Sequence, residues 1–193
     1  DRYSKRMETD TSIKILNIMS GAQDGGAECF FERFCVAIEK KKNFKQKVVI
    51  KKNKKRFNFL KNSINDLEQL FLFNFVNPFF HQRVKNIFLE FKPDIVLSWM
   101  NRASILLPKS KYFNEQKIGR LGGYYNLKYY LKCDYLIANT LDIKKYICKN
   151  GWDPDKVICI PNFVNTNNKS KMEVPISKKG KIILCLGAIH SES

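Results

Sequence analysis

Short apolar runs alternate with longer amphipathic segments along most of the chain, and this alternation predicts a regular order of strands and helices. The first run, Ile13–Met19, leads directly into Ser20-Gly21 and predicts a buried strand. Apolar positions between Glu28 and Lys41 then recur at helical spacing, so we expect a helix there. The further predicted strands are 47–51, 67–73, 95–99, 117–121, 135–139 and 157–160. The further predicted helices are 54–62, 78–91 and 140–148.

Strands that alternate with helices predict an α/β fold, a Rossmann-like open parallel sheet with helices on both faces. We expect this domain to cover residues 13–161, after a polar lead at 1–12 that looks disordered or tag-like. Residues 162–180 are rich in Asn, Lys, Ser and Pro and predict a linker. A fresh apolar run followed by Gly187 predicts that residues 181–193 begin a second domain.

The chain is strongly basic, with 35 Lys and Arg against 18 Asp and Glu and a formal net charge of +17. The excess is concentrated between Lys40 and Arg56. Such a charge attracts nucleic acid, anionic lipid headgroups or a phosphorylated substrate. A Lys-rich surface without a specific partner explains the same composition, so charge alone does not choose among these readings.

The cysteines and histidines show no metal-ligand spacing, since no C-x-x-C motif occurs and the chain has two histidines. We therefore expect reduced thiols and no metal. These residues are Cys29, Cys35, Cys133, Cys148, Cys159, Cys185, His81 and His190. No apolar run approaches the roughly 20 residues that span a bilayer, and the lead has no apolar signal-peptide core. The expected location is cytoplasmic.

A glycine-rich turn, 21–28, joins the first predicted strand to the first predicted helix. Glycines such as Gly25 and Gly26 allow positive φ and let a ligand approach the backbone closely. The N–H groups at a helix start attract phosphate or a sugar oxygen. The turn lacks the dinucleotide fingerprint, and a purely structural tight turn remains the alternative.

Two further polar clusters follow predicted strands, where ligands of open α/β sheets bind. Asn101 and Arg102 come after the strand 95–99, and their side chains suit hydroxyl groups and an anion. The alternative is a helix cap with a surface Arg. The second cluster runs from Arg120 to Tyr125, where tyrosine rings offer flat faces to a sugar or lipid or pack in the core.

Other catalytic arrangements find no support in the sequence. Asp94 and Asp134 precede their strands, which places them at the opposite edge of the sheet. No Ser-His-Asp arrangement and no phosphate-binding Lys loop occurs.

The order of several motifs resembles glycosyltransferase family 4, in a bacterial group linked to lipopolysaccharide or other surface glycans. The motifs are Gly25-Gly26-Ala27-Glu28, Lys92-Pro93-Asp94-Ile95-Val96, Trp99-Met100-Asn101-Arg102, Arg120-Leu121-Gly122-Gly123-Tyr124-Tyr125, and Gly151-Trp152 through Val157 to Pro161-Asn162-Phe163-Val164. The resemblance covers nearly everything from Ile13 to His190. It implies the amino-terminal half of a GT-B enzyme with two nucleotide-fold domains, retaining and metal-independent, with no cofactor besides the nucleotide-sugar substrate.

The resemblance also implies a division of the site between donor and acceptor. The residues expected against the donor phosphates and the cleft are Gly25, Gly26, Ala27 and His190. Those expected on the side of a glycan or lipid-linked acceptor are Asn101, Arg102, Arg120, Gly122, Gly123, Tyr124 and Tyr125. The basic residue that stabilises the leaving diphosphate belongs to the second domain of the family. We therefore expect little transfer by this chain without a carboxyl-terminal half, which a separate chain could supply.

The main alternative is a non-enzymatic module whose basic segment binds a membrane surface or nucleic acid. No aromatic and basic RNA-binding motif occurs, which disfavours nucleic acid. Peripheral contact with an anionic membrane fits either reading, because Phe57 and Phe59 follow the basic stretch. This contact would place the protein at the inner face of the cytoplasmic membrane.

Overall fold

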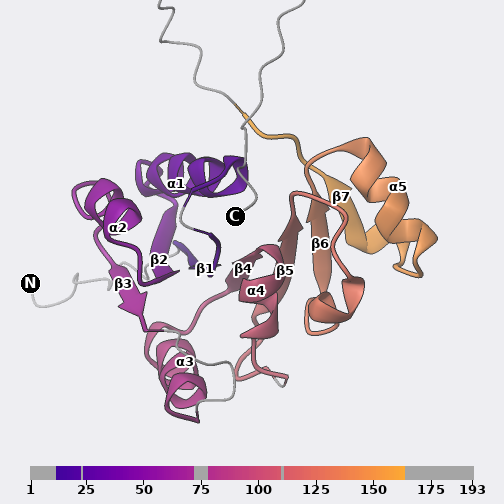
Figure 1. The fold of residues 1–193 in the computed structure, drawn as a ribbon. Helices are drawn as coiled ribbons and strands as arrows, with labels where there is room; N and C mark the ends of the chain where they lie inside the picture. The colour runs from indigo at the N-terminus through magenta and orange to yellow at the C-terminus, as the bar shows by residue number, and fades with distance from the viewer. Residues whose placement is uncertain (1–11, 23, 72–77, 110, 164–193) are drawn as a thin grey trace, which may run out of the picture. The chain divides into compact units, whose positions relative to one another are not determined.

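One parallel sheet organises the described part of the chain, which a computed structural model gives for residues 12–22, 24–71, 78–109 and 111–163 (Figure 1). Its seven strands lie in the order β3-β2-β1-β4-β5-β6-β7. The strands are β1 Ile13–Met19, β2 Phe44–Lys51, β3 Leu67–Leu70, β4 Ile95–Trp99, β5 Gln116–Leu121, β6 Tyr135–Ala138 and β7 Val157–Cys159. The helices are α1 Gly26–Glu39, α2 Lys54–Leu60, α3 Pro78–Phe91, α4 Met100–Ile105 and α5 Leu141–Lys149, with 3-10 turns η1 Leu127–Tyr130 and η2 Pro154–Lys156. The predicted Rossmann-like fold is confirmed.

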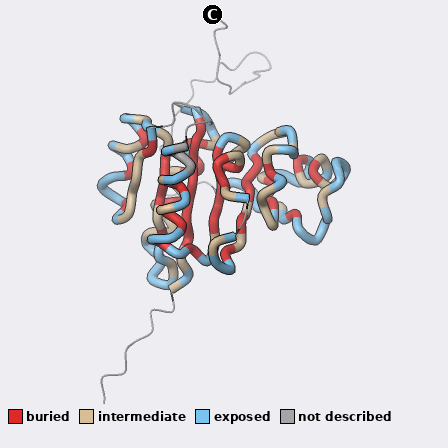
Figure 2. Tube along the Cα trace, turned by 90° about the horizontal axis from the view of Figure 1, so that it is seen from below, coloured by how far each residue is buried: buried red, intermediate tan, exposed pale blue. Residues whose placement is uncertain are grey.

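Helices cover both faces of the sheet, because alternate strand residues point to opposite sides. On one face, Leu16 and Ile18 pack with Ile87 and Phe88 of α3 and with Ala103 of α4. The other face is covered by α1 and α2, whose packed side chains include Phe31, Cys35 and Leu60, against Met19 and Val48. A third cluster joins α5 to β6 and β7. Buried residues therefore run along the strands, whereas the outer turns of the helices are exposed (Figure 2).

The strand order reverses between β1 and β4, which are neighbours in the sheet. Met19 at the end of β1 is in register with Trp99 of β4, and Trp99 with Arg120 of β5. In open α/β sheets the crevice outside the carboxyl ends of strands at such a reversal is the usual place for a ligand. The topology therefore brings the ends of β1, β4 and β5 together at one edge.

The sequence predicts the strands within a few residues, but it misses α4 and the 3-10 turns. Apolar spacing carries no signal for α4, because a six-residue helix directly follows β4. The chain turns sharply there through Met100, whose φ is 64°. Residues 72–73 of the predicted third strand lie outside the described residues, as do the lead at 1–11 and the stretch 164–193, which holds most of the predicted linker and the second-domain strand.

Thr140 caps α5, and its side-chain oxygen accepts a hydrogen bond from the Ile143 N–H at 3.2 Å. We expect Thr140→Ala to lower the free energy of unfolding by about 1 kcal/mol, because that N–H loses its partner. Thr140→Ser keeps the hydroxyl and should stay within a few tenths of a kcal/mol of the parent protein in urea unfolding. Equal losses in the two variants would show that the cap contributes nothing.

Candidate functional site

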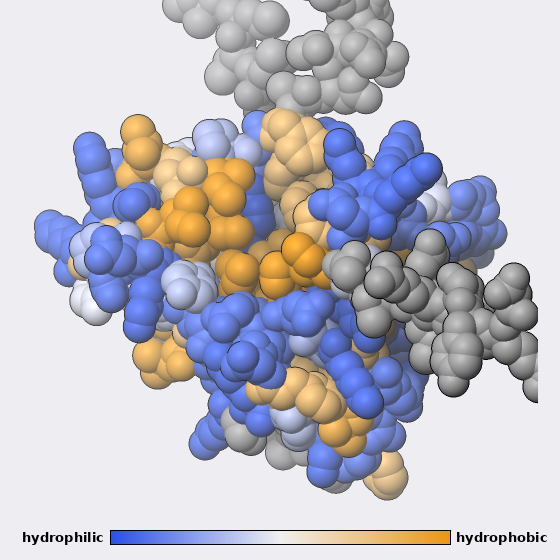
Figure 3. All heavy atoms as spheres, turned by 180° about the vertical axis from the view of Figure 1, so that it is seen from behind, coloured by the Kyte–Doolittle hydropathy of each residue, from blue (hydrophilic) through white to orange (hydrophobic). Residues whose placement is uncertain are grey.

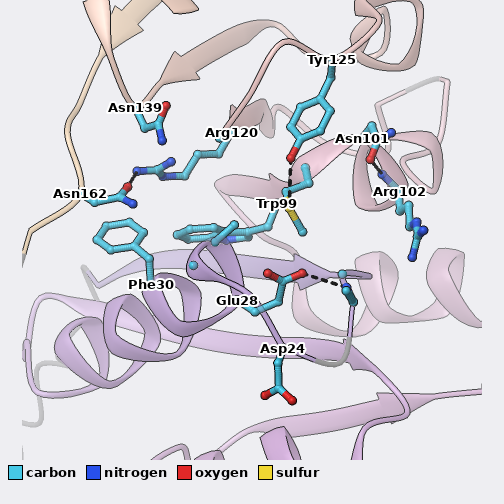
Figure 4. A pocket seen from close by; sticks show the side chains of 16 residues that line it. Asp24, Glu28, Phe30, Trp99, Asn101, Arg102, Arg120, Tyr125, Asn139 and Asn162 are labelled. Carbon is cyan, nitrogen blue, oxygen red and sulfur yellow. Dashed lines mark hydrogen bonds between the residues drawn. The ribbon is translucent and has the colours of Figure 1, made fainter. Parts of the chain in front are cut away.

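An open cleft of about 640 Å³ lies at the carboxyl edge of the sheet (Figure 4). Its walls come from the β1–α1 turn, the first turns of α1 and α4, and the residues that follow β5, β6 and β7. The residues that line it are Gly21, Ala22, Asp24, Gly26, Ala27, Glu28, Phe30, Trp99, Met100, Asn101, Arg102, Arg120, Gly122, Tyr125, Asn139 and Asn162. Carboxylates of Asp24 and Glu28 thus lie in the same cleft as the guanidinium groups of Arg102 and Arg120.

Arg120 supplies a buried positive charge to the cleft, with only 6% of its surface exposed. Its guanidinium lies 4.6 Å from the Phe30 ring centroid and 5.2 Å from that of Trp99. It donates to Asn162 Oδ1 at 2.6 Å, and it forms no ion pair with a carboxylate among the described residues. Burial lowers the pKa of Arg120 to about 10, so it stays charged at neutral pH. A desolvated cation without a carboxylate partner favours an incoming anion or sugar oxygen.

A buried chain of hydrogen-bonded polar groups fixes the position of the Trp99 indole. Its indole Nε1–H donates to Asn17 Oδ1 at 3.1 Å, and the Asn17 amide donates to Gln46 Oε1 at 3.2 Å. Gln46 in turn donates to the Cys35 carbonyl and to Glu39. Satisfied buried networks of this kind fix side-chain positions. The indole is therefore a rigid floor for the cleft and for Arg120.

Glu28, in the first turn of α1, stabilises the β1–α1 turn through its carboxylate. Its carboxylate is 5% exposed and accepts a hydrogen bond from the Ala22 N–H at 2.8 Å. A methyl group on Gly25 would overlap this carboxylate, so Gly25 is needed here for space, while its φ of 164° is ordinary extended backbone. Glu28 also adds a negative charge near the helix start, where a negative charge is favoured.

Gly26 differs from Gly25, because a methyl group added to it would meet no heavy atom within 4 Å and would project at the cleft. We expect Gly26→Ala to keep or slightly raise the free energy of unfolding, since alanine at a helical position costs less backbone entropy. The Kd of a ligand in the cleft should rise about tenfold, because the methyl group prevents close contact with the backbone; this rise corresponds to roughly 1.4 kcal/mol of binding free energy. Thermal unfolding and ligand titration of the same sample measure both effects. Unchanged affinity would show that ligands do not approach this turn.

The start of α4 forms the wall opposite α1. The Tyr125 hydroxyl donates to Met100 Sδ at 3.6 Å, and Asn101 Oδ1 accepts from the Arg102 N–H. Burial, and to a smaller degree Glu28, raises the pKa of Tyr125, so its hydroxyl stays protonated at neutral pH. Lys132 Nζ donates to two carbonyls at the far end of α4, Ile105 at 2.6 Å and Leu107 at 2.7 Å. This cation suits the negative end of a helix dipole.

The structure brings most of the predicted site residues into the cleft, and these are Gly26, Ala27, Asn101, Arg102, Arg120, Gly122 and Tyr125. Gly25, Gly123 and Tyr124 lie outside its lining. Tyr124 is exposed, donates a hydrogen bond to Asp142 and packs on Tyr146. His190 lies outside the described residues. Asp94 and Asp134 lie at the amino edge, where their carboxylates accept N–H bonds from Lys14 and Lys117.

The other residues of the cleft were not among the predicted site residues: Gly21, Ala22, Asp24, Glu28, Phe30, Trp99, Met100, Asn139 and Asn162. Asn139 directly follows β6, so the strand-end argument that selected Arg120 could also have found it. Asn162 lies a few residues after β7, but the Asn-, Lys-, Ser- and Pro-rich composition of residues 162–180 placed it in the predicted linker. Phe30 and Glu28 carry no such signal, because their helical spacing fits a core position and a helix-dipole charge equally well.

Within the described segments, no three His, Cys, Asp or Glu side chains gather as metal ligands do. The five cysteines within these segments are free, and Cys35 is buried. None of the helices described is both long enough and apolar enough to cross a bilayer.

Two curated proteins of Rhizobium meliloti (strain 1021) are similar to this chain. The lipopolysaccharide core biosynthesis glycosyltransferase LpsD is 30% identical over 154 residues, which is 78% of this chain and 43% of LpsD. The lipopolysaccharide core biosynthesis glycosyltransferase LpsE is 28% identical over 173 residues, 84% of this chain and 48% of LpsE. The chain thus spans less than half the length of these relatives. No protein-family model matches the sequence.

Solved structures agree on the fold. The chain has the fold of a GT-B glycosyltransferase domain. The lipopolysaccharide outer core galactosyltransferase WaaB superposes with a TM-score of 0.65 at 16% identity, over 81% of this chain and 47% of WaaB. Anabaena HepE, solved with UDP and glucose, gives 0.61 at 13% identity, over 79% and 45%. A putative UDP-N-acetylglucosamine 2-epimerase from Listeria monocytogenes gives 0.58 at 16% identity, over 76% and 44%. The fold is therefore shared by proteins named for different reactions.

Proposed function

We propose that this chain supplies the acceptor-binding half of a glycosyltransferase that builds lipopolysaccharide or another cell-envelope glycan. The sugar would come from a nucleotide-sugar and pass to a glycan or lipid-linked acceptor. The two Rhizobium relatives support this reaction class by their names, and the UDP and glucose bound to HepE support the kind of donor. The chemistry of the cleft supports the acceptor role.

The observation that carries the proposal is Arg120, a buried guanidinium that lies against the Phe30 and Trp99 rings and lines the cleft. Aromatic faces suit the apolar face of a sugar ring. Amides such as Asn139 and Asn162 suit its hydroxyl groups, and Arg120 suits an acceptor oxygen or anionic substituent. A site of this composition binds a polar ligand that combines apolar faces with oxygen atoms.

We also propose that the transfer is retaining and metal-independent, with the leaving diphosphate stabilised by a second nucleotide-fold domain. Departure of a diphosphate requires preorganised positive charge at the oxygens that become negative. Glu28 places negative charge beside the α1 start, which favours hydroxyl groups there over a diphosphate. The proposed role of Gly26 and Ala27 is thus to let the reacting sugar approach the backbone.

A chimera tests the proposed reaction. The segment of LpsD that aligns with this chain is replaced by the matching residues of this chain, and radiolabelled nucleotide-sugars are offered with lipopolysaccharide core as the acceptor. We expect sugar incorporation, unchanged by EDTA, with retention of the anomeric configuration in the product. A folded chimera that binds the donor nucleotide but transfers no sugar contradicts the proposal.

We expect the 193-residue chain alone to transfer sugar at least 1,000-fold more slowly than the chimera, because oxyanion-type stabilisation alone contributes about 10²–10³ in rate. Closure of a two-domain cleft, which also excludes water, would be lost as well. The same incorporation assay measures this difference. Transfer by the isolated chain at the rate of the chimera would show that the described residues contain the whole active site.

Peripheral membrane contact is a further part of the proposal. Lys52 lies 4.5 Å from the ring of the exposed Phe71, and Phe59 is also exposed, so basic and aromatic groups occur on neighbouring elements. The back of the molecule also carries a hydrophobic band (Figure 3), on which the proposed contact does not depend. We expect co-sedimentation with vesicles that contain anionic lipid, weakening as salt rises. Equal binding to neutral vesicles would contradict this contact.

A further inference from the structure

A second, strongly basic groove of about 540 Å³ lies beside the cleft. It is formed where β2 ends and α2 begins, together with the β1–α1 turn and the first turn of α4. Its lining contains no Asp or Glu and consists of Gly21, Ala22, Lys51, Lys52, Asn53, Lys54, Lys55, Arg56 and Arg102. Six of these nine residues are Lys or Arg, so positive charge is concentrated in the groove.

Three of the six basic side chains already have partners. Lys55 pairs with Asp24 at 2.6 Å, the buried Arg56 pairs with Glu32 at 3.1 Å, and Lys52 lies over the Phe71 ring. The other three, Lys51, Lys54 and Arg102, form no ion pair with any carboxylate of the described segments. The groove therefore carries positive charge that the described protein does not neutralise.

Arg102 joins the groove to the cleft, because it lines both. Gly21 and Ala22 line both as well, so the two hollows share a wall without bulky side chains. Asp24 and Lys55 form an exposed ion pair at the same border. A ligand whose sugar lies in the cleft could thus extend past Arg102 into the groove without leaving the surface.

We propose that the groove is an anion subsite that holds a phosphate or carboxylate group attached to the acceptor, while the acceptor's sugar occupies the cleft. This proposal rests on the glycosyltransferase function proposed above, and it names the kind of acceptor: an anionic glycan. Lys51, Lys54 and Arg102 would supply the charge-assisted hydrogen bonds. The diphosphate of the donor has the same chemistry, so the test separates these two sources.

The test uses the 193-residue chain and isothermal titration at low salt. We expect glucose 6-phosphate to bind at least tenfold more tightly than glucose. The double variant Lys51→Gln/Lys54→Gln should weaken glucose 6-phosphate at least tenfold, whereas the affinity of the chain for UDP, weak in the parent without the second domain, should not change. The control Lys41→Gln/Lys42→Gln removes the same charge from exposed residues before β2, at the other edge of the sheet, and should stay within twofold of the parent. Thermal unfolding verifies that all variants are folded.

Three results would overturn the subsite. They are equal affinity for glucose and glucose 6-phosphate, equal weakening in the control variant, and a loss confined to UDP, which would assign the groove to the donor. The chimera assay addresses the transferase proposal separately. An inactive chimera together with the expected titrations removes the transferase function and keeps an anion-binding groove. An active chimera with failed titrations keeps the function and removes the subsite.

Discussion

Arg120→Met in the chimera should lower sugar transfer by at least 100-fold, while the fold keeps its stability. The loss follows because one preorganised charge-assisted donor in a buried site contributes about 10²–10³ in rate. The stability is kept because Arg120 has no carboxylate partner among the described residues, so its removal leaves no buried carboxylate unpaired. Methionine is flexible and apolar and can pack against the Phe30 and Trp99 rings in place of the arginine. Initial transfer rates and the urea midpoint measure the two effects.

A matched variant sharpens this prediction. Arg120→Lys keeps the charge but lacks the planar, bidentate fork that lies against the two rings, so it should recover only part of the lost rate. A variant Arg120→Met with normal transfer would remove Arg120 from the site. A variant that unfolds would show that the guanidinium is structural, with Asn162 Oδ1 and the Ile160 carbonyl as its necessary partners.

Trp99→Ala should cause the largest loss of stability, about 3–5 kcal/mol in the free energy of unfolding. Trp99 is 2% exposed and packs its ring on Phe31 and Phe34 at centroid distances of 5.1 and 5.2 Å. Its removal also leaves Asn17 Oδ1 without its indole donor, which adds the cost of an unsatisfied buried acceptor. Urea unfolding monitored by far-UV circular dichroism measures the loss.

The control for Trp99 is Phe59→Ala, an aromatic deletion at a side chain that is 52% exposed. It should change the free energy of unfolding by no more than about 0.5 kcal/mol. Similar losses in the two variants would contradict the view that the Trp99 indole is the packed floor of the cleft. A small loss of unfolding free energy in both variants would mean that the neighbouring aromatic rings move to fill the space left by the Trp99 side chain.

The fold was predictable because each strand and most helices carry their own local signal. Ile13–Met19 is an apolar run bounded by a turn, and Thr140 with Asn150-Gly151 brackets α5. Helix α4 has no such signal, because it is six residues long and is entered through a positive φ at Met100. Tertiary contacts, and not local preference, determine an element of that length.

The candidate site was predictable where a polar residue directly follows a strand. That argument places Asn101 correctly in the cleft, and Arg120, the penultimate residue of β5, reaches the same edge. It gives no means to separate Tyr125, which faces the cleft, from its neighbour Tyr124, which bonds to Asp142. The orientation of successive residues in a loop depends on contacts far apart in the sequence.

The central claim is that the carboxyl-edge cleft binds a glycan acceptor, and an NMR titration of this chain with core oligosaccharide released from lipopolysaccharide tests it most directly. The expected result is saturable shifts of the backbone amides of Gly26, Arg120 and Tyr125, with Lys14 and Lys117 at the amino edge unmoved. Saturable shifts confined to the amino edge, or none at any concentration, would contradict the account.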